Sequence, residues 1–300
     1  MPSFRAAPVR VRVPATSANL GPGFDAAGLA LGLHDIVEAQ IIDRGLEVDI
    51  AGEGADSLKR NERNLVVTAM RAAFDAMGGQ PRGLRLLCAN RIPQSRGLGS
   101  SAAAVVAGVT VARELVLGGL DDDRTLGIAT AVEGHPDNVA AALFGGLTLA
   151  WRDGDGATHA VRLPVAPEVS PVAFVPAASR VSTAKARALL PAAVPHADAA
   201  VSAGRAALLA TALGGRLDLL LPATEDRLHQ PYRLEAQPRG AALVDKLRAG
   251  GHAAVLSGSG PTVLALCASP AQAVAATAAA GKSFEAMVLP VDLDGATVVS

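Results

Sequence analysis

Segments with the two-residue period of a strand alternate with segments of helical spacing along the whole chain. Residues 9–15 (VRVRVPA), 28–42 and 45–50 indicate strands, and residues 64–77 carry apolar side chains at helical spacing and end in a glycine pair. The strand pattern of 83–90 precedes an Ala- and Val-rich helix from about residue 100 to residue 117. This interleaving predicts a mixed fold of α and β elements.

The pattern changes after Trp151, where the turn-rich segment RDGDGATH follows. Further strands are expected at 157–163, 171–177 and 285–291, and helices around 183–190, 197–213, 239–249 and 270–280. We therefore expect an N-terminal domain of residues 1–152 and a C-terminal domain of residues 153–300.

Charge and cysteine content exclude several classes of protein. The chain has 27 Lys and Arg against 28 Asp and Glu, so it lacks the basic excess of a general nucleic-acid binder. Cys88 and Cys267 lie far apart in apolar runs, which is neither a disulfide framework nor a zinc spacing. No apolar stretch reaches the roughly 18 residues of a membrane span, and no signal-peptide pattern opens the chain. We expect a cytoplasmic protein without a nucleic-acid or membrane partner.

A glycine-rich turn at 97–101 (GLGSS) opens the long Ala- and Val-rich helix. Glycine allows close backbone approach, and a helix N-terminus offers free N–H groups and a positive dipole end. Ser100 and Ser101 add hydroxyls for phosphate oxygens or a magnesium ion. The segment therefore suits phosphate binding, although a serine-capped helix after a glycine turn would have the same pattern.

Two polar segments offer further candidate residues. In VPATSANLGPGFDAAGLAL (13–31), Asn19 and Asp25 are expected in a loop between strands, where they suit either a polar ligand or an ordinary turn. In AVEGHPDN (131–138), Glu133, His135 and Asn138 crowd the junction of two helices. A carboxylate near a phosphate loop fits Mg²⁺, whereas a helix cap would explain the same residues structurally.

The second half contributes a Gly-Ser-Gly-Pro turn at 258–261 and several cations. The turn lies between two strands, so it is either a hairpin turn or a segment packed against a site where side chains would obstruct. Thr183, Arg187 and Arg233 offer hydroxyl and guanidinium groups. Arginine binds carboxylates in bidentate fashion, but it also occurs as solvated surface.

With these segments together, the chain resembles the homoserine kinases of the galactokinase, homoserine kinase, mevalonate kinase and phosphomevalonate kinase (GHMP) superfamily. PATSANLGPGFD at 14–25, GLGSSAAA at 97–104 and GSGPT at 258–262 resemble the three superfamily motifs. SANLGPGFD, EGHPDN and STAKAR are more specific to homoserine kinases. The resemblance covers essentially the whole length.

The resemblance implies an α+β fold of two domains. The N-terminal domain would be like domain 2 of ribosomal protein S5, and the C-terminal domain would be ferredoxin-like. It also implies transfer of phosphate from ATP to L-homoserine with Mg²⁺, on the route to threonine, by a homodimer.

The resemblance further assigns roles to single residues. Asn19 and Asp25 would contact homoserine, Asp25 through its ammonium group, while Arg187 and Arg233 would hold its carboxylate with Thr183 and His135 nearby. Ser101 and Glu133 would hold Mg²⁺. The ATP-binding residues would be Gly97, Leu98, Gly99, Ser100 and Ser101 at the phosphates, Gly258, Ser259 and Gly260 in the third motif, Asn64 on the adenine side and Arg91 beside the base.

The identity of Asn138 bears on whether the reaction needs a side-chain base. Asn138 resembles the position at which mevalonate-kinase-type relatives carry an aspartate proposed as general base, and an amide cannot accept a proton at neutral pH. We therefore predict transfer by positioning, with Asn138 orienting the hydroxyl and no essential side-chain base. Ala27 and His34 depart from the family pattern, and both are interpreted as packing changes.

Two alternatives differ in class. Another GHMP kinase would act on shikimate, mevalonate or a sugar, but Asn138 and the set Thr183, Arg187 and Arg233 favour an amino-acid substrate. A catalytically inactive relative would typically lack the metal carboxylate or the phosphate loop, and this sequence retains both.

Overall fold

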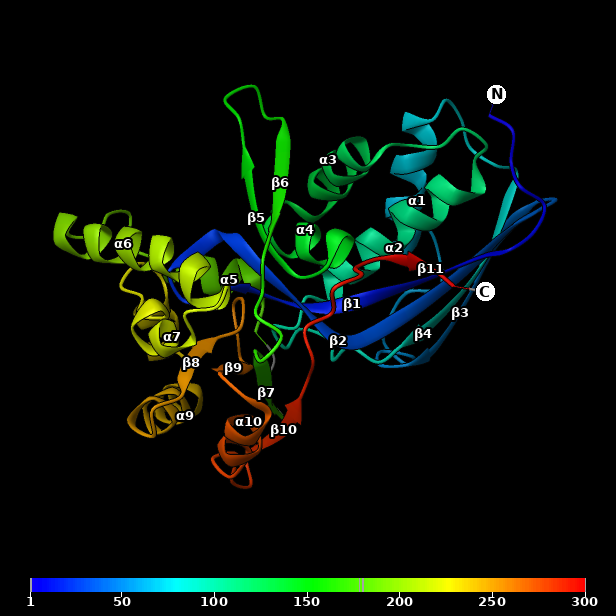
Figure 1. The fold of residues 1–300 in the computed structure, drawn as a ribbon. Helices are drawn as coiled ribbons and strands as arrows, with labels where there is room; N and C mark the ends of the chain where they lie inside the picture. The colour runs from blue at the N-terminus through cyan, green and yellow to red at the C-terminus, as the bar shows by residue number, and fades with distance from the viewer. Residues whose placement is uncertain (1, 178, 180, 300) are drawn as a thin grey trace.

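A computed structural model describes residues 2–177, 179 and 181–299, and it contains two β-sheets with helices packed around them (Figure 1). The first sheet has the order β11-β1-β2-β4-β3, and β5 pairs with β2 and with β6. Its strands are β1 (Val9–Asn19), β2 (Gly23–Ile42), β3 (Gly45–Gly52), β4 (Gly83–Asn90), β5 (Leu147–Arg152), β6 (Thr158–Leu163) and β11 (Thr297–Val298).

Strands β1 and β2 extend into the segment that the sequence analysis assigned to a loop. β1 ends at Asn19 and β2 begins at Gly23, so Asp25 lies within a strand. The predicted loop containing Asn19 and Asp25 was therefore wrong, because both residues belong to strands. Residues 15–23 are buried throughout, and Ala15–Ala18 pair with Leu31–Gly28 of β2.

Four helices pack with this sheet: α1 (Leu65–Ala76), α2 (Ser100–Leu115), α3 (Asp122–Glu133) and α4 (Asp137–Phe144). Alanine and valine make up most of α2, which contacts α1, α3 and α4 as well as β1 and β2. Small side chains permit such close approach on all sides. Asp121 caps α3 by accepting a hydrogen bond from the Arg124 N–H at 2.8 Å, as its position before the helix predicts.

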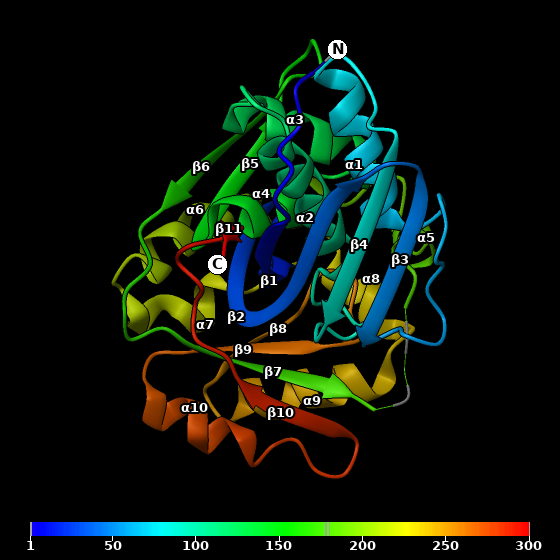
Figure 2. The ribbon, with the colours of Figure 1, turned by 90° about the vertical axis from the view of Figure 1, so that its right-hand side faces the viewer.

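The second sheet is antiparallel with the order β10-β7-β9-β8 (Figure 2). Helices α9 (Pro238–Ala249) and α10 (Pro270–Thr277) pack against it. The chain order strand, helix, strand, strand, helix, strand confirms the predicted ferredoxin-like arrangement. The strands are β7 (Ser170–Pro176), β8 (Ala253–Leu256), β9 (Val263–Cys267) and β10 (Phe284–Val288).

Both faces of the second sheet are buried, but in different surroundings. Val172 and Phe174 of β7 belong to the cluster that includes α9 and α10. Ala173 and Val175, which alternate with them, join the main core of the molecule. Because successive strand residues face opposite sides, β7 packs against the helices and the main core at once.

Between β7 and β8 lie α5 (Thr183–Ala188), α6 (His196–Leu213), a 3₁₀ turn (Leu217–Leu219), α7 (Leu220–Ala223) and α8 (Gln230–Glu235). α6 packs against α7, and α8 against α9 and β8. The cationic candidates Arg187 and Arg233 are thereby placed on two short helices, α5 and α8. No helix in the described part of the chain is long and apolar enough to cross a membrane.

The first sheet takes strands from both sides of residue 152. β6 pairs with β5 over Thr158–Leu163, and β11, near the end of the chain, pairs with β1 (Figure 1). His34 Nε2 also lies 2.6 Å from Asp292 Oδ2, which ties β2 to the returning C-terminal segment. His34 therefore hydrogen-bonds across to the C-terminal segment, a contact that its interpretation as a packing change did not include.

Candidate active site

A cavity of about 510 Å³ is lined by all five segments that the sequence singled out. The cavity lies where the adjacent ends of β1 and β2, the start of α2, the junction of α3 and α4, α5 with α8, and the turn between β8 and β9 meet. Polar groups from both halves of the chain therefore converge on one space, which is the usual form of a small-molecule site.

The glycine turn at the start of α2 has a backbone that other residues would strain. Gly97 and Gly99 have φ of 81° and 66°, and a Cβ built on Gly99 would lie 1.9 Å from Thr16 Oγ1. Gly99 is the N-cap of α2, and no side chain caps this helix within the described residues. The N–H groups of its first turn remain available to an anion.

The turn between β8 and β9 packs directly on this loop. A Cβ on Gly97 would lie 2.4 Å from the Ser257 carbonyl oxygen and 2.9 Å from that of Gly260. The Ser257 hydroxyl donates to the Gly97 carbonyl oxygen at 2.5 Å and lies 2.8 Å from Ser17 Oγ. The glycines of the turn between β8 and β9 thus pack against the glycine turn before α2. This agrees with the interpretation of residues 258–261 as a segment packed against a site.

Ser101 and Glu133 form the oxygen-rich corner of the cavity. Ser101 Oγ donates to Glu133 Oε2 at 2.6 Å, and burial raises the pKa of Glu133 despite this hydrogen bond. A buried carboxylate gains from a cation nearby. The described residues contain no cluster of three metal-ligating side chains. One carboxylate with one hydroxyl suits Mg²⁺, which keeps most of its shell for water and phosphates, so these residues fit the ion.

Asp137 and Asn138 open α4 at the centre of the site. Asn138 Oδ1 accepts a hydrogen bond from Thr16 Oγ1 at 2.8 Å, which fixes the orientation of the amide. Asp137 Oδ1 accepts from the Asn138 N–H at 2.7 Å, and burial raises the pKa of Asp137. The cavity wall therefore carries an oriented amide beside a nearly inaccessible carboxyl.

Asp25 and Arg187 pair with each other across the mouth of the cavity. Arg187 Nη1 and Nη2 donate to the two carboxylate oxygens of Asp25, each at 2.8 Å, in a bidentate pair. The pair is only partly buried, with 42% of the Arg187 side chain and 37% of the Asp25 side chain exposed. Asn19 Oδ1 accepts from the Asp25 N–H at 3.0 Å and so holds the position of that residue.

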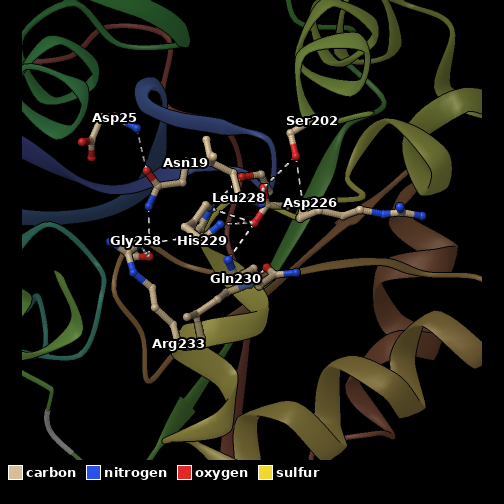
Figure 3. A network of polar contacts seen from close by, with 12 residues as sticks. Asn19, Asp25, Ser202, Asp226, Leu228, His229, Gln230, Arg233 and Gly258 are labelled. Atoms are coloured by element: carbon tan, nitrogen blue, oxygen red, sulfur yellow. Dashed lines mark hydrogen bonds and ion pairs between the residues drawn. The ribbon is translucent and has the colours of Figure 1, made fainter. Parts of the chain in front are cut away.

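Arg233 is the most deeply buried cation of the site, with 1% of its surface exposed. Its Nη1 donates to the Gly258 carbonyl oxygen at 3.1 Å, and Asn19 Nδ2 donates to the same oxygen at 3.0 Å (Figure 3). The guanidinium also lies over the Phe24 ring, 5.1 Å from its centroid. Burial lowers the pKa of Arg233, so this group strongly favours an anion.

Most predicted residues line this cavity, but two do not. Leu98 is fully buried beneath the glycine turn, and its carbonyl oxygen accepts from the Thr16 N–H. Arg91 is exposed, because the alternation of β4 directs Cys88 and Asn90 toward the cavity. Lining residues among the predicted ones are Asn19, Asp25, Asn64, Gly97, Gly99, Ser100, Ser101, Glu133, His135, Asn138, Thr183, Arg187, Arg233, Gly258, Ser259 and Gly260.

Asn64 lines the cavity, but both ends of its side-chain amide form hydrogen bonds that stabilise the start of α1. Its Oδ1 accepts from the Val66 N–H at 3.0 Å as N-cap of α1, and its Nδ2 donates to the Lys59 carbonyl oxygen at 2.8 Å. The apolar side of the cavity beside it was not predicted. It contains Val37, Ile50, Leu58, Leu65 and Val66.

Asp35 and Cys88 are buried titratable groups in that apolar wall. Burial raises the pKa of Asp35 to about 6, although its Oδ1 accepts hydrogen bonds from the Arg91 and Ile92 N–H groups. Burial also raises the pKa of the Cys88 thiol to about 12. Thr16, Asp35 and Asp137 were not assigned to the site from the sequence. Of these, only Asp137 carried a signal, as the neighbour of Asn138 in EGHPDN.

The chain matches two models of one family. Residues 64–146 match the GHMP kinases N terminal domain, and residues 200–286 match the GHMP kinases C terminal model. Homoserine kinases of Streptomyces avermitilis and Streptomyces coelicolor are each 58% identical to it over 301 residues. These alignments cover 99% of this chain and 98% and 96% of those proteins.

Crystal structures show the same architecture. The homoserine kinase of Cytophaga hutchinsonii superposes with a TM-score of 0.87 at 26% identity, over 100% of this chain and 99% of that chain. A mevalonate kinase of L. major in complex with R-mevalonate gives a TM-score of 0.70 at 18% identity, over 97% and 98% of the two chains. The second likeness concerns the fold alone.

Proposed function

This chain belongs to the homoserine kinases of the GHMP kinase family, and we propose that it transfers the γ-phosphoryl group of ATP to the side-chain hydroxyl of L-homoserine. ATP-dependent phosphorylation of homoserine is the activity of this family, a step in threonine biosynthesis. The product is O-phospho-L-homoserine.

One observation carries the proposal: the glycine turn before α2, the charged residues Asp25, Arg187 and Arg233, and Asn138 all line one cavity. The free N–H groups at the start of α2 suit the phosphates of ATP. Arg187 and Arg233 suit a carboxylate, and Asp25 suits an ammonium group. A substrate with both charges and a hydroxyl at its far end would span this space.

Ser101 and Glu133 would hold Mg²⁺ beside the phosphates. When bound, Mg²⁺ would supply positive charge that offsets the negative charge growing on the phosphates during transfer. Ser101 and Glu133 supply the hard oxygen ligands for it, at the corner where burial leaves the Glu133 carboxylate poorly solvated.

The residues of the chain contribute mainly by positioning, because phosphoryl transfer passes through a loose transition state. Thr16 fixes the Asn138 amide, which would orient the homoserine hydroxyl toward the γ-phosphorus. The hydroxyl oxygen forms a bond to phosphorus as the bond to the β-phosphate oxygen breaks and ADP leaves. The hydroxyl proton passes to a phosphate oxygen or to water, so no side chain needs to act as base.

A substrate panel tests this function. ADP release is measured with Mg-ATP and L-homoserine, in parallel with L-threonine, L-serine, shikimate and mevalonate. We expect turnover confined to L-homoserine. Turnover of another acceptor would leave the kinase activity but overturn the assignments of Asp25, Arg187 and Arg233. ATP binding without turnover of any acceptor would identify an inactive relative.

Two further properties belong to the same proposal. We propose a homodimer and a cytoplasmic location, both from the family resemblance, and a division of the chain near residue 152. Sedimentation of the purified protein tests the dimer: a single species of 30.2 kDa would exclude it.

A further inference from the structure

His229 lies between Arg233 and the turn that joins β1 to β2. Its Nε2 is 2.8 Å from the Gly21 carbonyl oxygen in the turn between β1 and β2, and its Nδ1 is 3.2 Å from Arg233 Nη1. The ring also stacks on Phe24, with centroids 4.8 Å apart. His229 is fully buried and lies outside the cavity lining, so it acts on the site through its neighbours (Figure 3).

The two contacts define one protonation state of the ring. A carbonyl oxygen only accepts, so Nε2 must carry a hydrogen and donate it to Gly21. A guanidinium only donates, so Nδ1 must be unprotonated and accept from Arg233. His229 is therefore neutral, and burial, which lowers its pKa, favours the same form.

These contacts leave some nitrogens of the Arg233 guanidinium without a hydrogen-bond partner among the described residues. Nη1 is engaged by His229 and by the Gly258 carbonyl oxygen. Nε has no hydrogen-bond partner among the described residues although it is buried, and no hydrogen bond of Nη2 is found there. Nε and Nη2 form one edge of the planar group, which matches the two oxygens of a carboxylate.

We propose that neutral His229 is a positioning residue that turns the Nε and Nη2 edge of Arg233 toward the substrate carboxylate and ties it to the β1–β2 turn. This inference rests on the proposed function, because it assumes an amino-acid substrate. Asp226 holds the histidine in place. Its Oδ2 accepts from the N–H groups of His229 and Gln230, and its Oδ1 from the Leu228 N–H (Figure 3).

Two substitutions separate the two contacts. In His229→Asn, the amide oxygen can take the place of Nδ1 and accept from Arg233, but the donor to Gly21 is lost. In His229→Gln, the amide nitrogen can take the place of Nε2 and donate to Gly21, but the acceptor for Arg233 is lost. KM and kcat are measured for L-homoserine and for ATP in both variants.

We expect His229→Gln to raise the KM for L-homoserine on the order of 10- to 100-fold, the effect of losing one hydrogen bond to a charged group. His229→Asn should stay within about threefold of the wild type, and neither variant should change the KM for ATP beyond about twofold. Leu243→Ala, a cavity in α9 away from the site, controls for loss of stability and should leave both KM values unchanged. Equal effects of the two His229 variants, or a larger effect of asparagine, would overturn the proposal.

The tautomer can also be measured without a substitution. Nitrogen NMR of the wild-type protein with labelled histidine should show one ring with Nε2 protonated and Nδ1 unprotonated from pH 6 to pH 8. A protonated Nδ1 at His229 would contradict the inference even if both variants failed to fold. Absence of wild-type turnover with L-homoserine would instead refute the proposed function, and the NMR result would still stand on its own.

Discussion

Asn138 is the residue at which the mechanism is most open to test. Its amide oxygen accepts from Thr16 and its amide nitrogen Nδ2 lies 3.4 Å from Asp137 Oδ1, so a carboxylate placed there would face a second carboxyl at close range. Like charges at such a distance raise each other's pKa and disturb the site. We expect Asn138→Asp to lower kcat on the order of 10-fold or more, with little change in the KM for L-homoserine. A substantial rise in kcat without a change in substrate binding would refute transfer by positioning alone.

Asp35 provides a pH dependence of stability that is independent of catalysis. Its pKa rises from an ordinary 3.8 to about 6 on folding, so the folded state binds more protons than the unfolded state between these values. Stability is therefore lost as pH rises from about 4 to about 6. Asp35→Asn removes this loss, so it should stabilise the protein by up to about 3 kcal/mol above pH 6 and by little near pH 4.

Urea unfolding of wild type and Asp35→Asn at pH 4, 5, 6 and 7.5 measures this difference. Asp49→Asn, which changes an exposed carboxylate on β3 of the same sheet, is the matched control and should show no such trend. A difference that does not grow with pH would contradict the raised pKa.

Single residues differ in how well the sequence predicted their place. Asn19, Asp25, Glu133 and Arg233 line the cavity because their segments keep motif spacing that is local in the chain. Thr16 had no such signal, since its contact with Asn138 spans 122 positions and depends on how β1 meets α4. The roles given to these residues remain predictions.

At the scale of elements, the glycine turn before α2 depends on Gly99. A methyl group there would meet Thr16 Oγ1 at 1.9 Å, and a φ of 66° costs other residues about 1–2 kcal/mol. We expect Gly99→Ala to displace the turn and to lower kcat/KM for ATP on the order of 100-fold. Gly127→Ala is the matched control, because nothing lies within 4 Å of its Cβ in helix α3.

Gly127→Ala should leave kcat/KM unchanged and stabilise the helix by about 0.5–1 kcal/mol. Steady-state kinetics with varied ATP, together with thermal unfolding of both variants, measure the contrast. Equal kinetics of Gly99→Ala and wild type would show that the turn tolerates a side chain and would weaken its role at the phosphates.

Most helices and strands were predicted within a few residues, because period and capping signals are local. The errors lie where tertiary pairing decides. β1 runs to Asn19 and β2 starts at Gly23 because the two strands pair with each other, which leaves a turn of only residues 20–22. Turn-forming residues alone do not reveal this pairing. The pairing of β6 with β5 could not be predicted from residues 153–160 either, because a hairpin turn and a linker between domains have similar composition.

At the scale of the molecule, the C-terminal segment that follows β10 connects the second sheet to the first through hydrogen bonds of Asp292. Asp292 accepts from His34 Nε2 at 2.6 Å, from the Gly295 N–H at 2.7 Å and from the Asp294 N–H at 3.1 Å. Burial raises the pKa of Asp292, but these hydrogen bonds outweigh it and hold the pKa below its ordinary value. We expect Asp292→Ala to cost about 2–4 kcal/mol of unfolding free energy at neutral pH.

Because the pKa of Asp292 is lowered on folding, its contribution is present above the ordinary value near 3.8 and lost as pH falls below it. The deficit of Asp292→Ala should therefore shrink in acid. Asp294→Ala, two residues away and 68% exposed with a partner at 3.4 Å, should cost little at any pH. Denaturant unfolding measures the loss of unfolding free energy in both variants. Equal losses would show that the connection between the two sheets does not depend on Asp292.

The whole-molecule arrangement was the part least accessible to sequence reasoning. The order of the second sheet and the two-domain fold were implied by the family resemblance and are confirmed. Residue patterns alone gave no sign that the chain end returns to β1, because two residues of β11 carry too little pattern to identify a partner.

The pair between Asp25 and Arg187 joins β2 of the first sheet to α5, which follows the first strand of the second. A ligand that carries both an ammonium and a carboxylate group can take over both partners, so the two elements stay bridged through it. A plain alcohol offers neither charge and would leave Asp25 and Arg187 paired with each other, whereas an amine or a carboxylic acid could satisfy only one of them. If the proposed function holds, this pair would therefore favour a zwitterionic substrate over a neutral polyol.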